Sequence, residues 1–462
     1  MLVKFRVKNF KSFKDMNEFS MIKGKQRFYE DRVAEFDDAK VLKFSAIFGA
    51  NASGKSNLIR AIKVMQWIVL NNMVPTDAVE EYYKLDSSCA SLPTYFEMIF
   101  TIKNVFYSYG FEVFLGNKKI ESEWLYVLHK KSDGTIDEKM VFEKKNNDIL
   151  FRNKNISERI SMYKEDIKLI PTKLFLTHVA SNRFAFANKN DEIAQNIISV
   201  FDWFQSSLRV LYTGEALYSP ELTAKINEDK IGALLNFFDT GIKSIALKQC
   251  DEYEFRKEAG VGGFGFDLNS LQNSLEMKNK NKRNEKESLI IRTVSDIWIV
   301  MLDNDEHKLK YYRLCFYHDK EKNIPFRVVN ESDGTLRLFE LAEAVINDKT
   351  DRVIIVDELD RCLHPILTIK YIKLFLNKAL EKNNNSQLIV TTHESRLMDL
   401  DILRRDEIWF TKKENGESKL YSLEEFNVRF DRIIDKAYLD GRYGGIPIFD
   451  SVFFPEYIKH EN

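Results

Sequence analysis

The chain has 462 residues, 44% of them hydrophobic, and its 69 basic and 70 acidic residues leave a net charge of −1. This length allows roughly two to four domains with a large buried core. No apolar run reaches the roughly 18 residues of a membrane span, and the four cysteines form no C-x-x-C pair. The composition therefore argues against a membrane protein, a zinc site and a disulfide framework. We expect a cytoplasmic protein, because the N-terminus also lacks a signal-peptide pattern.

The first chemical signal is the stretch IFGANASGKSNLIRAI, residues 47–62, which matches G-x-x-x-x-G-K-[ST]. An apolar strand precedes this loop, and a segment with apolar residues at helical spacing follows it. Loop N–H groups and a helix N-terminus bind phosphate, the lysine reaches the β- and γ-phosphates, and the serine hydroxyl joins Mg²⁺. The nucleotide-binding residues predicted here are Gly49, Asn51, Ser53, Gly54, Lys55, Ser56 and Asn57.

The segment that follows alternates with period two over residues 94–131, around a GNKK turn, and continues to residue 151. This pattern predicts a meander of antiparallel strands. From about residue 157 to 236 the pattern becomes helical, with one predicted apolar face. Its members are Ile193, Ile197, Val200, Phe201, Phe204 and Leu208. A lobe that only packs on its neighbours and a surface for dimerisation or a partner both fit this segment.

The Lys/Asn-rich run 277–287 fits either a solvated loop or a basic arm that contacts phosphates. Residues 295–319 then predict a hairpin that turns at Asp303-Asn304-Asp305. A hairpin turn is preferred there to a nuclease metal site, because no upstream strand supplies a matching glutamate.

Far downstream, RVIIVDELD at 352–360 places four β-branched residues before Asp357 and Glu358. A run without alternation is typical of a strand buried on both faces of a parallel sheet. Asp357 would bind Mg²⁺ through water, so the predicted metal residues are Ser56 and Asp357. Glu358 would act as the general base for the attacking water. A second buried strand in 386–395 ends near His393, which we predict to contact the γ-phosphate as a second catalytic residue.

Between the meander and Asp357, the segment NESDGTLRLFELAEAV at 330–345 predicts a helix that opens at Ser332-Asp333-Gly334-Thr335, an anion site. In chain order, the glycine loop, the segment at 330–345, the strand before Asp357 and the strand before His393 form four motifs. They resemble the Walker A, signature, Walker B and switch histidine of ABC-type ATPases. The signature, here Glu331-Ser332-Asp333-Gly334-Thr335 instead of L-S-G-G-Q, looks like the RecF, SMC and OLD group. The segments FRVKNFKSF (5–13) and YLDGRYGGIPIF (438–449) resemble ATPases of bacterial phage-defence loci, such as RloA-like proteins and AriA of the PARIS system.

The resemblance implies an α/β fold, namely an ABC-type P-loop ATPase head with an antiparallel β-subdomain and an inserted helical lobe. The expected divisions are residues 1–156 (first half of the head, with the P-loop and β-subdomain), 157–290 (helical lobe and mobile loop) and 291–462 (second half of the head). The implied cofactors are ATP and Mg²⁺, and the implied assembly is a homodimer or higher homo-oligomer through the heads.

In such an assembly, Ser332 and Gly334 of one chain would contact the γ-phosphate on Lys55 of the other. Asp360 matches the D-loop aspartate that crosses the dimer interface. Asn9 and Lys11 would lie near the base or the α-phosphate. The family also uses a glutamine that reaches Mg²⁺, and this residue stays unassigned: Gln66 lies on the P-loop helix, and residues 174–183 offer only Asn182.

Our leading hypothesis is an ATP-dependent sensor and scaffold of a two-component anti-phage system that acts by abortive infection. It would control a separate nuclease or toxin protein, because residues 394–462 leave no room for a TOPRIM nuclease domain. A RecF-like DNA repair ATPase and an ATP-gated module without hydrolysis are the alternatives, so nucleic acid stays open as a partner. The tetrapeptide NKND at 188–191 matches a guanine-reading motif, but a signature and a switch histidine are not GTPase parts.

Overall fold

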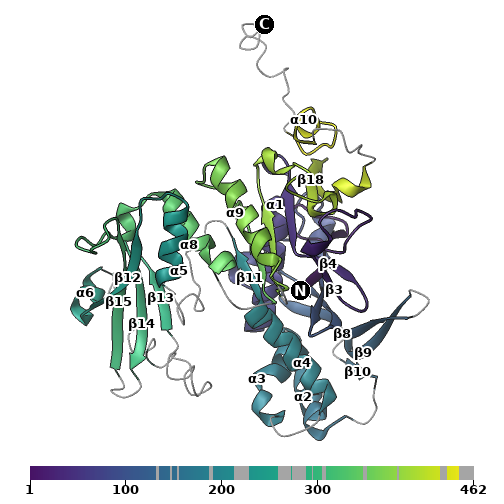
Figure 1. Cartoon of the computed structure of the whole chain (residues 1–462). Coiled ribbons are helices and arrows are strands. Elements are labelled where there is room, and N and C mark those ends of the chain that lie inside the picture. The colour runs from purple at the N-terminus through teal and green to yellow at the C-terminus, as the bar shows by residue number, and fades with distance from the viewer. Residues whose placement is uncertain are drawn as a thin grey trace. The chain divides into compact units, whose positions relative to one another are not determined.

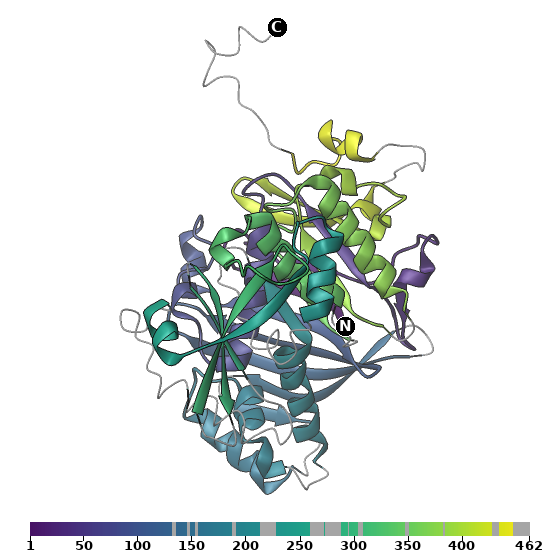
Figure 2. The same ribbon diagram turned by 60° about the vertical axis from the view of Figure 1, so that its left-hand side comes forward.

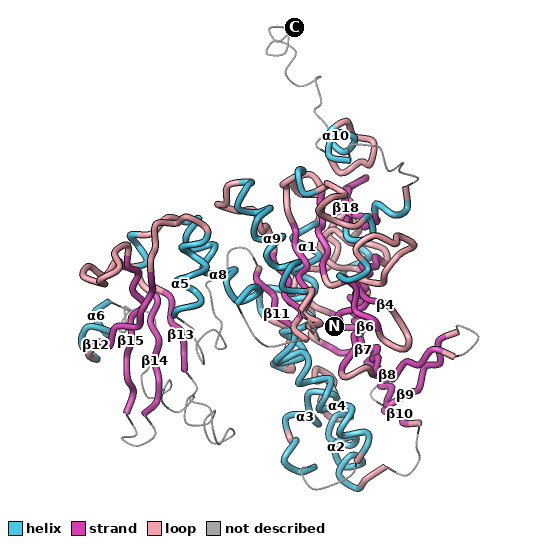
Figure 3. The backbone as a smooth tube through the Cα atoms, in the orientation of Figure 1, coloured by secondary structure: helices cyan, strands magenta, loops and turns pink. Residues whose placement is uncertain are grey.

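The computed structural model describes residues 1–131, 135–145, 148–152, 156–186, 191–212, 228–258, 272, 288–293, 295–303, 308–346, 351–381, 384–426 and 434–446. The chain divides into two compact units (Figures 1 and 2). The first unit contains Met1–Thr213, Lys349–Leu359 and Leu376–Asn462, and the second contains Gly214–Asp348 and Asp360–Phe375. Both units mix helices and strands (Figure 3), so the fold class is α/β, as expected.

A six-stranded sheet forms the centre of the first unit, in the order β11-β16-β17-β5-β18-β19. Its strands are β11 (Leu208–Leu211), β16 (Val353–Val356), β17 (Gln387–Thr391), β5 (Phe44–Phe48), β18 (Ile408–Glu414) and β19 (Glu417–Ser422). All neighbours run parallel except β18 and β19. Every residue of β5, β16 and β17 is buried, as the unbroken apolar run at 353–356 predicted. Parallel strands end at one edge of a sheet, so the loops after β5, β11, β16 and β17 meet there.

A seven-stranded sheet, also in the first unit, has the order β10-β9-β8-β7-β6-β1-β2, and its neighbouring strands run antiparallel. Its strands are β1 (Leu2–Lys8), β2 (Asn17–Ser20), β6 (Thr94–Ile102), β7 (Val105–Phe114), β8 (Lys119–Lys130), β9 (Ile136–Lys145) and β10 (Asp148–Phe151). A small hairpin of β3 (Val33–Glu35) and β4 (Lys40–Leu42) lies outside it. The meander predicted from the alternating pattern is confirmed.

Helices of the first unit pack into one continuous hydrophobic core with the two sheets. They are α1 (Lys55–Asn71), α2 (Glu158–Lys168), α3 (Phe175–Ser181) and α4 (Glu192–Asp202). A further helix of this unit, α10 (Ile434–Leu439), follows near the C-terminus. Figure 1 shows α2, α3 and α4 grouped together. These three helices account for the first part of the predicted helical segment.

The prediction that one helical face extends to Leu208 is wrong. After Asp202 the chain makes a π-helical turn, and Leu208 begins β11, where it pairs with Val353. The Gln66 side chain of α1 donates hydrogen bonds to Phe204 O and Leu208 O, both at 2.9 Å. Local periodicity was overridden by this tertiary contact, which ends the helix and directs the chain into the parallel sheet.

The second unit contains a four-stranded antiparallel sheet in the order β12-β15-β14-β13. Its elements are β12 (Ser244–Cys250), β13 (Ser288–Arg292), β14 (Ile297–Asp303), β15 (Lys308–Tyr317), α5 (Glu228–Phe237), α6 (Glu252–Glu258) and α8 (Asp333–Ile346). Helix α9 (Pro365–Ala379) contributes residues to both units. The predicted hairpin is confirmed, because Asp303 pairs with Lys308.

Several patterns noted in the sequence lie outside the described residues. They are the hairpin positions Asn304 and Asp305, the run 277–287 and most of the NKND tetrapeptide. The last residue of that tetrapeptide, Asp191, is described: its carboxylate accepts a hydrogen bond from Ala194 N–H and caps α4. Within the described parts of the chain, no helix is long and apolar enough to cross a bilayer.

Candidate nucleotide site

The glycine loop joins β5 to α1, so the predicted strand, loop and helix are all present. Gly49 and Gly54 have positive φ angles. A Cβ at Gly49 would overlap Thr411 Oγ1, and one at Gly54 would overlap Ser418 Oγ, so only glycine fits at either end of the loop. The P-loop is therefore packed directly against β18 and β19.

Inside the loop, Lys55 is the first residue of α1 and is almost fully buried. Its ammonium donates hydrogen bonds to Gly49 O at 2.7 Å and Ala50 O at 3.0 Å. Ser53 Oγ lies 2.5 Å from Thr411 Oγ1, and Asn51 is exposed. The lysine is thus held in the loop by carbonyl oxygens that an incoming phosphate would replace.

Ser56 and Asp357 are 301 positions apart in sequence, and the fold brings them into contact. The Ser56 hydroxyl donates to Asp357 Oδ1 at 3.1 Å, and Thr391 Oγ1 donates to the same oxygen at 2.7 Å. Asp357 is buried at the end of β16, and Thr391 is the last residue of the adjacent strand β17. The P-loop, the end of β16 and the end of β17 therefore meet at one carboxylate.

Glu358 follows immediately and has a φ of 48°, a left-handed conformation that costs a non-glycine residue free energy. Its backbone N–H donates to Thr391 Oγ1 at 2.7 Å, so one hydroxyl fixes both acidic residues. His393 lies two residues beyond β17, at the same edge of the sheet, and is exposed. The two predicted catalytic residues thus lie just beyond the ends of neighbouring parallel strands.

The donor set at Asp357 fits Mg²⁺. Within the described residues there is no group of three or more His, Cys, Asp or Glu side chains that could form a complete metal cage. Mg²⁺ bound to a nucleotide does not need such a cage, because waters and phosphate oxygens supply most of its six ligands. A serine hydroxyl and one carboxylate are the protein groups that such a site requires.

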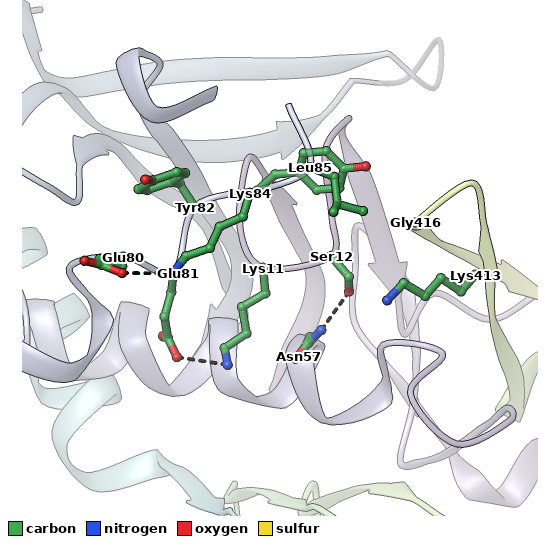
Figure 4. A pocket seen from close by; sticks show the side chains of 11 residues that line it. Lys11, Ser12, Asn57, Glu80, Glu81, Tyr82, Lys84, Leu85, Lys413 and Gly416 are labelled. Carbon is green, nitrogen blue, oxygen red and sulfur yellow. Dashed lines mark hydrogen bonds and ion pairs between the residues drawn. The ribbon is translucent and has the colours of Figure 1, made fainter. Parts of the chain in front are cut away.

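A pocket of about 380 Å³ opens beside the start of α1 (Figure 4). It is lined by Lys11, Ser12, Asn57, Glu80, Glu81, Tyr82, Tyr83, Lys84, Leu85, Lys413 and Gly416. Asn57 belongs to the first turn of α1 and donates to Ser12 Oγ at 2.7 Å. Lys11 Nζ forms an ion pair with Glu81 Oε1 at 3.0 Å. This position next to the P-loop suits the base and sugar of a nucleotide, and it contains the predicted residues Lys11 and Asn57.

Asn9, predicted together with Lys11, is not among the residues that line this pocket. It is buried, and its amide donates to Cys89 O and Leu92 O, each at 2.9 Å. Its Oδ1 accepts from Tyr83 N–H at 3.2 Å. The side chain thus holds the loop that forms one wall of the pocket.

The predicted signature and D-loop residues lie in the second unit. Helix α8 begins at Asp333, as expected, and Ser332 Oγ accepts a hydrogen bond from Thr335 N–H at 3.1 Å. A Cβ at Gly334 would lie 2.8 Å from Cys362 O, two positions after Asp360, so the start of α8 and the segment after Asp360 are in close contact. Ser332 itself is exposed.

Two residues at the site were missed by the sequence analysis. Thr391 looked like one more member of a buried strand. Tyr212 directly follows β11, and the backbone N–H of Asp357 donates to Leu211 O at 2.9 Å, which places Tyr212 at the end of the strand beside Asp357. Burial, and after it the Asp357 carboxylate, raise the pKa of Tyr212. The available signal was the short run Leu208-Arg209-Val210-Leu211 before Tyr212, in which three of four residues are apolar.

The two candidates for a glutamine-like magnesium ligand have other roles. The Gln66 side chain donates hydrogen bonds to Phe204 O and Leu208 O, at the turn that leads into β11. Asn182 caps the C-terminal end of α3, where its amide donates to His178 O at 2.9 Å.

Comparison with protein families decides the identity of the chain. The model of the family described as "AAA domain, putative AbiEii toxin, Type IV TA system" matches residues 44–399, from β5 past His393. The chain belongs to this family. Among solved structures, this AAA-domain protein is similar to the SMC head domain from Thermotoga maritima, at 15% identity over 91% of this chain and 98% of that chain, with a TM-score of 0.32. No curated protein matches the sequence.

Proposed function

We propose that this AAA-domain protein is an ABC-type ATPase that hydrolyses ATP with Mg²⁺ held by Ser56 and Asp357. The observation that carries the proposal is the hydrogen-bonded cluster of Ser56, Asp357 and Thr391 beside the P-loop lysine. Bound Mg²⁺ would neutralise charge on the phosphates. Lys55, already buried in the loop, would exchange the Gly49 and Ala50 carbonyls for phosphate oxygens.

In this mechanism Glu358 accepts a proton from the attacking water as general base. The hydrogen bond from Glu358 N–H to Thr391 Oγ1 holds its backbone in the left-handed conformation. His393, at the end of the adjacent strand, contacts the γ-phosphate. Ser332, Gly334 and Asp360 act on the nucleotide of a second chain, so hydrolysis requires a homodimer or a larger homo-oligomer.

The proposed biological role is the sensor and scaffold of a two-component anti-phage system that acts by abortive infection in the cytoplasm. The family description, which names a putative toxin of a Type IV TA system, supports a link with toxin–antitoxin systems. The partner would be a separate nuclease or toxin protein. ATP binding and hydrolysis would switch the assembly between holding and releasing it.

The first experiment compares ATP binding and ATP turnover in the unmodified chain, Glu358→Gln and Glu165→Gln. Glu165 is a matched control, because it is an exposed carboxylate on α2 paired with Lys168. Glu358→Gln should bind ATP normally and lose turnover by about 10²-fold or more, while Glu165→Gln behaves like the unmodified chain. Undiminished turnover in Glu358→Gln would contradict the role of Glu358. An unmodified chain that binds ATP without turnover would indicate a module gated by binding alone.

The second experiment expresses the chain with its native neighbouring genes and identifies proteins that copurify in stoichiometric amounts. A nuclease-like or toxin-like protein supports the two-component proposal. A chain that purifies alone and hydrolyses ATP faster with DNA, with binding that weakens steeply as salt increases, would instead favour a DNA repair ATPase.

A further inference from the structure

The C-terminal motif that begins YLDGRYGG is not used in the mechanism above, yet the fold places it against the P-loop. It forms the end of α10 and a turn over Gly441–Gly445, called here the glycine turn. Gly441, Gly444 and Gly445 have φ angles of 78°, 69° and 71°. Left-handed angles at three positions explain why glycine recurs in this motif.

Aromatic side chains attach the glycine turn to β18. The Phe410 ring of β18 stacks on Tyr438 at 5.5 Å and on Tyr443 at 5.8 Å, both nearly parallel. Tyr438 Oη donates to Gly445 O at 3.0 Å, and Tyr421 Oη donates to Tyr443 O at 2.6 Å. Since Phe410 pairs with Phe48 of β5, the turn is anchored next to the strand that leads into the P-loop.

The contact with the P-loop is made by Gly445. A Cβ at this position would lie 3.2 Å from Thr411 O and 3.6 Å from the Cα of Gly49, the first glycine of the loop. Gly445 is buried, and Thr411 O is a backbone atom that cannot rotate away as a flexible side chain could, so it would have to shift, whereas 3.6 Å to the Gly49 Cα is an ordinary van der Waals contact. Thr411 also contacts Ser53 inside the loop. A side chain at 445 would therefore displace Thr411, and through Ser53 this displacement would pass to the loop.

We propose that Gly445 is a positioning residue for nucleotide binding, because it supports Gly49 in the backbone conformation that binds phosphate. The inference rests on the proposed nucleotide site. Phosphate binding needs several loop N–H groups to converge on one anion, so a shift of a few tenths of an ångström at Gly49 weakens several hydrogen bonds at once. A side chain at 445 should thus act mainly on the affinity for nucleotide.

The test compares Gly445→Ala with Gly441→Ala in the full chain. Both substitutions place alanine at a left-handed position of the same turn, but a Cβ at Gly441 meets only Ile446, with its nearest atom, Cδ1, at 2.9 Å. The readouts are the melting temperature, the Kd for a fluorescent ATP analogue, and KM and kcat for ATP. Both variants should melt at lower temperature, but only Gly445→Ala should weaken binding, by about tenfold, and raise KM more than it lowers kcat.

Equal nucleotide affinity in the two alanine variants would overturn the inference. If Gly445→Ala does not fold, Tyr438→Phe replaces it, because this change removes the hydrogen bond to Gly445 O and keeps the ring against Phe410. It should weaken binding several-fold, and unchanged binding would likewise overturn the inference. The unmodified chain and Lys55→Ala distinguish a failure of the proposed nucleotide site from a failure of the proposed role of Gly445. If neither chain binds the analogue, the proposed nucleotide site is wrong. If the unmodified chain binds the analogue and Lys55→Ala does not, only the role of Gly445 is in question.

Discussion

Thr391 offers the sharpest test of how the site is held together. The change is Thr391→Val, which replaces one buried hydroxyl by a methyl group of similar size. That hydroxyl donates to Asp357 Oδ1 and accepts from Glu358 N–H, both at 2.7 Å. Without this hydroxyl, the buried Asp357 Oδ1 loses one hydrogen-bond donor and keeps Ser56 as another. The N–H of Glu358, which has a strained φ angle, loses this acceptor.

The expected magnitude follows from these two groups. A buried polar group that loses its partner costs about 1–3 kcal/mol. Since Asp357 Oδ1 keeps the Ser56 donor, we expect the free energy of unfolding to fall by about 1–3 kcal/mol. Turnover should fall at least about tenfold, because a barrier increase of about 1.4 kcal/mol suffices for that and both acidic residues lose their common support. Thr391→Ser keeps the hydroxyl and should retain most of the stability and the turnover.

The assay is urea unfolding followed by tryptophan fluorescence, together with ATP turnover at saturating ATP. Thr392→Val is the matched control: Thr392 is also fully buried, but its hydroxyl accepts only the Glu394 N–H, at 3.1 Å. It should cost stability without a comparable loss of turnover. The reasoning is refuted if Thr391→Val unfolds and turns over like the unmodified chain, or if Thr391→Ser is impaired as strongly as Thr391→Val.

Two further predictions concern titratable groups. Burial raises the pKa of Glu407 from its ordinary 4.5 to about 8, so the folded chain keeps a proton that the unfolded chain loses between these values, and stability falls as pH rises through that window. Glu407→Gln should reduce the difference in the free energy of unfolding between pH 5.5 and pH 8, measured by urea unfolding, by up to a few kcal/mol. An unchanged difference would show that Glu407 does not titrate between these pH values. Burial also keeps the Tyr212 hydroxyl protonated beside Asp357, so Tyr212→Phe should lower kcat several-fold with little change in KM. Tyr107→Phe, which removes a hydrogen bond to Asn196, is its control, and equal kcat values in the two variants would exclude a role for Tyr212.

Much of the site could be predicted because its signals are local. Glycines and a lysine at fixed spacing between a strand and a helix specify a phosphate loop, and the structure places Lys55 and Ser56 at the start of α1. An unbroken β-branched run before two acidic residues specifies a buried parallel strand, and β16 is buried along its whole length. Alternation with period two specifies the meander β6 to β10. Each of these patterns depends on neighbours within a few positions.

Other features depend on contacts between distant segments, which no local pattern encodes. Leu208 continued a helical pattern, but the side chain of Gln66 and the pairing with β16 directed it into a strand. Thr391 became important only when the register of β17 against β16 placed its hydroxyl between Asp357 and Glu358.

The sequence by itself therefore determined the chemistry that we propose for this protein, because phosphate binding, metal binding and proton transfer require particular residue types at short spacing. Only the tertiary structure decided which residues support that chemistry. Ser56 meets Asp357 because parallel strands end at one edge of a sheet and bring distant segments within hydrogen-bond distance. Gly445 lies beside Gly49 because aromatic side chains anchor its turn on β18.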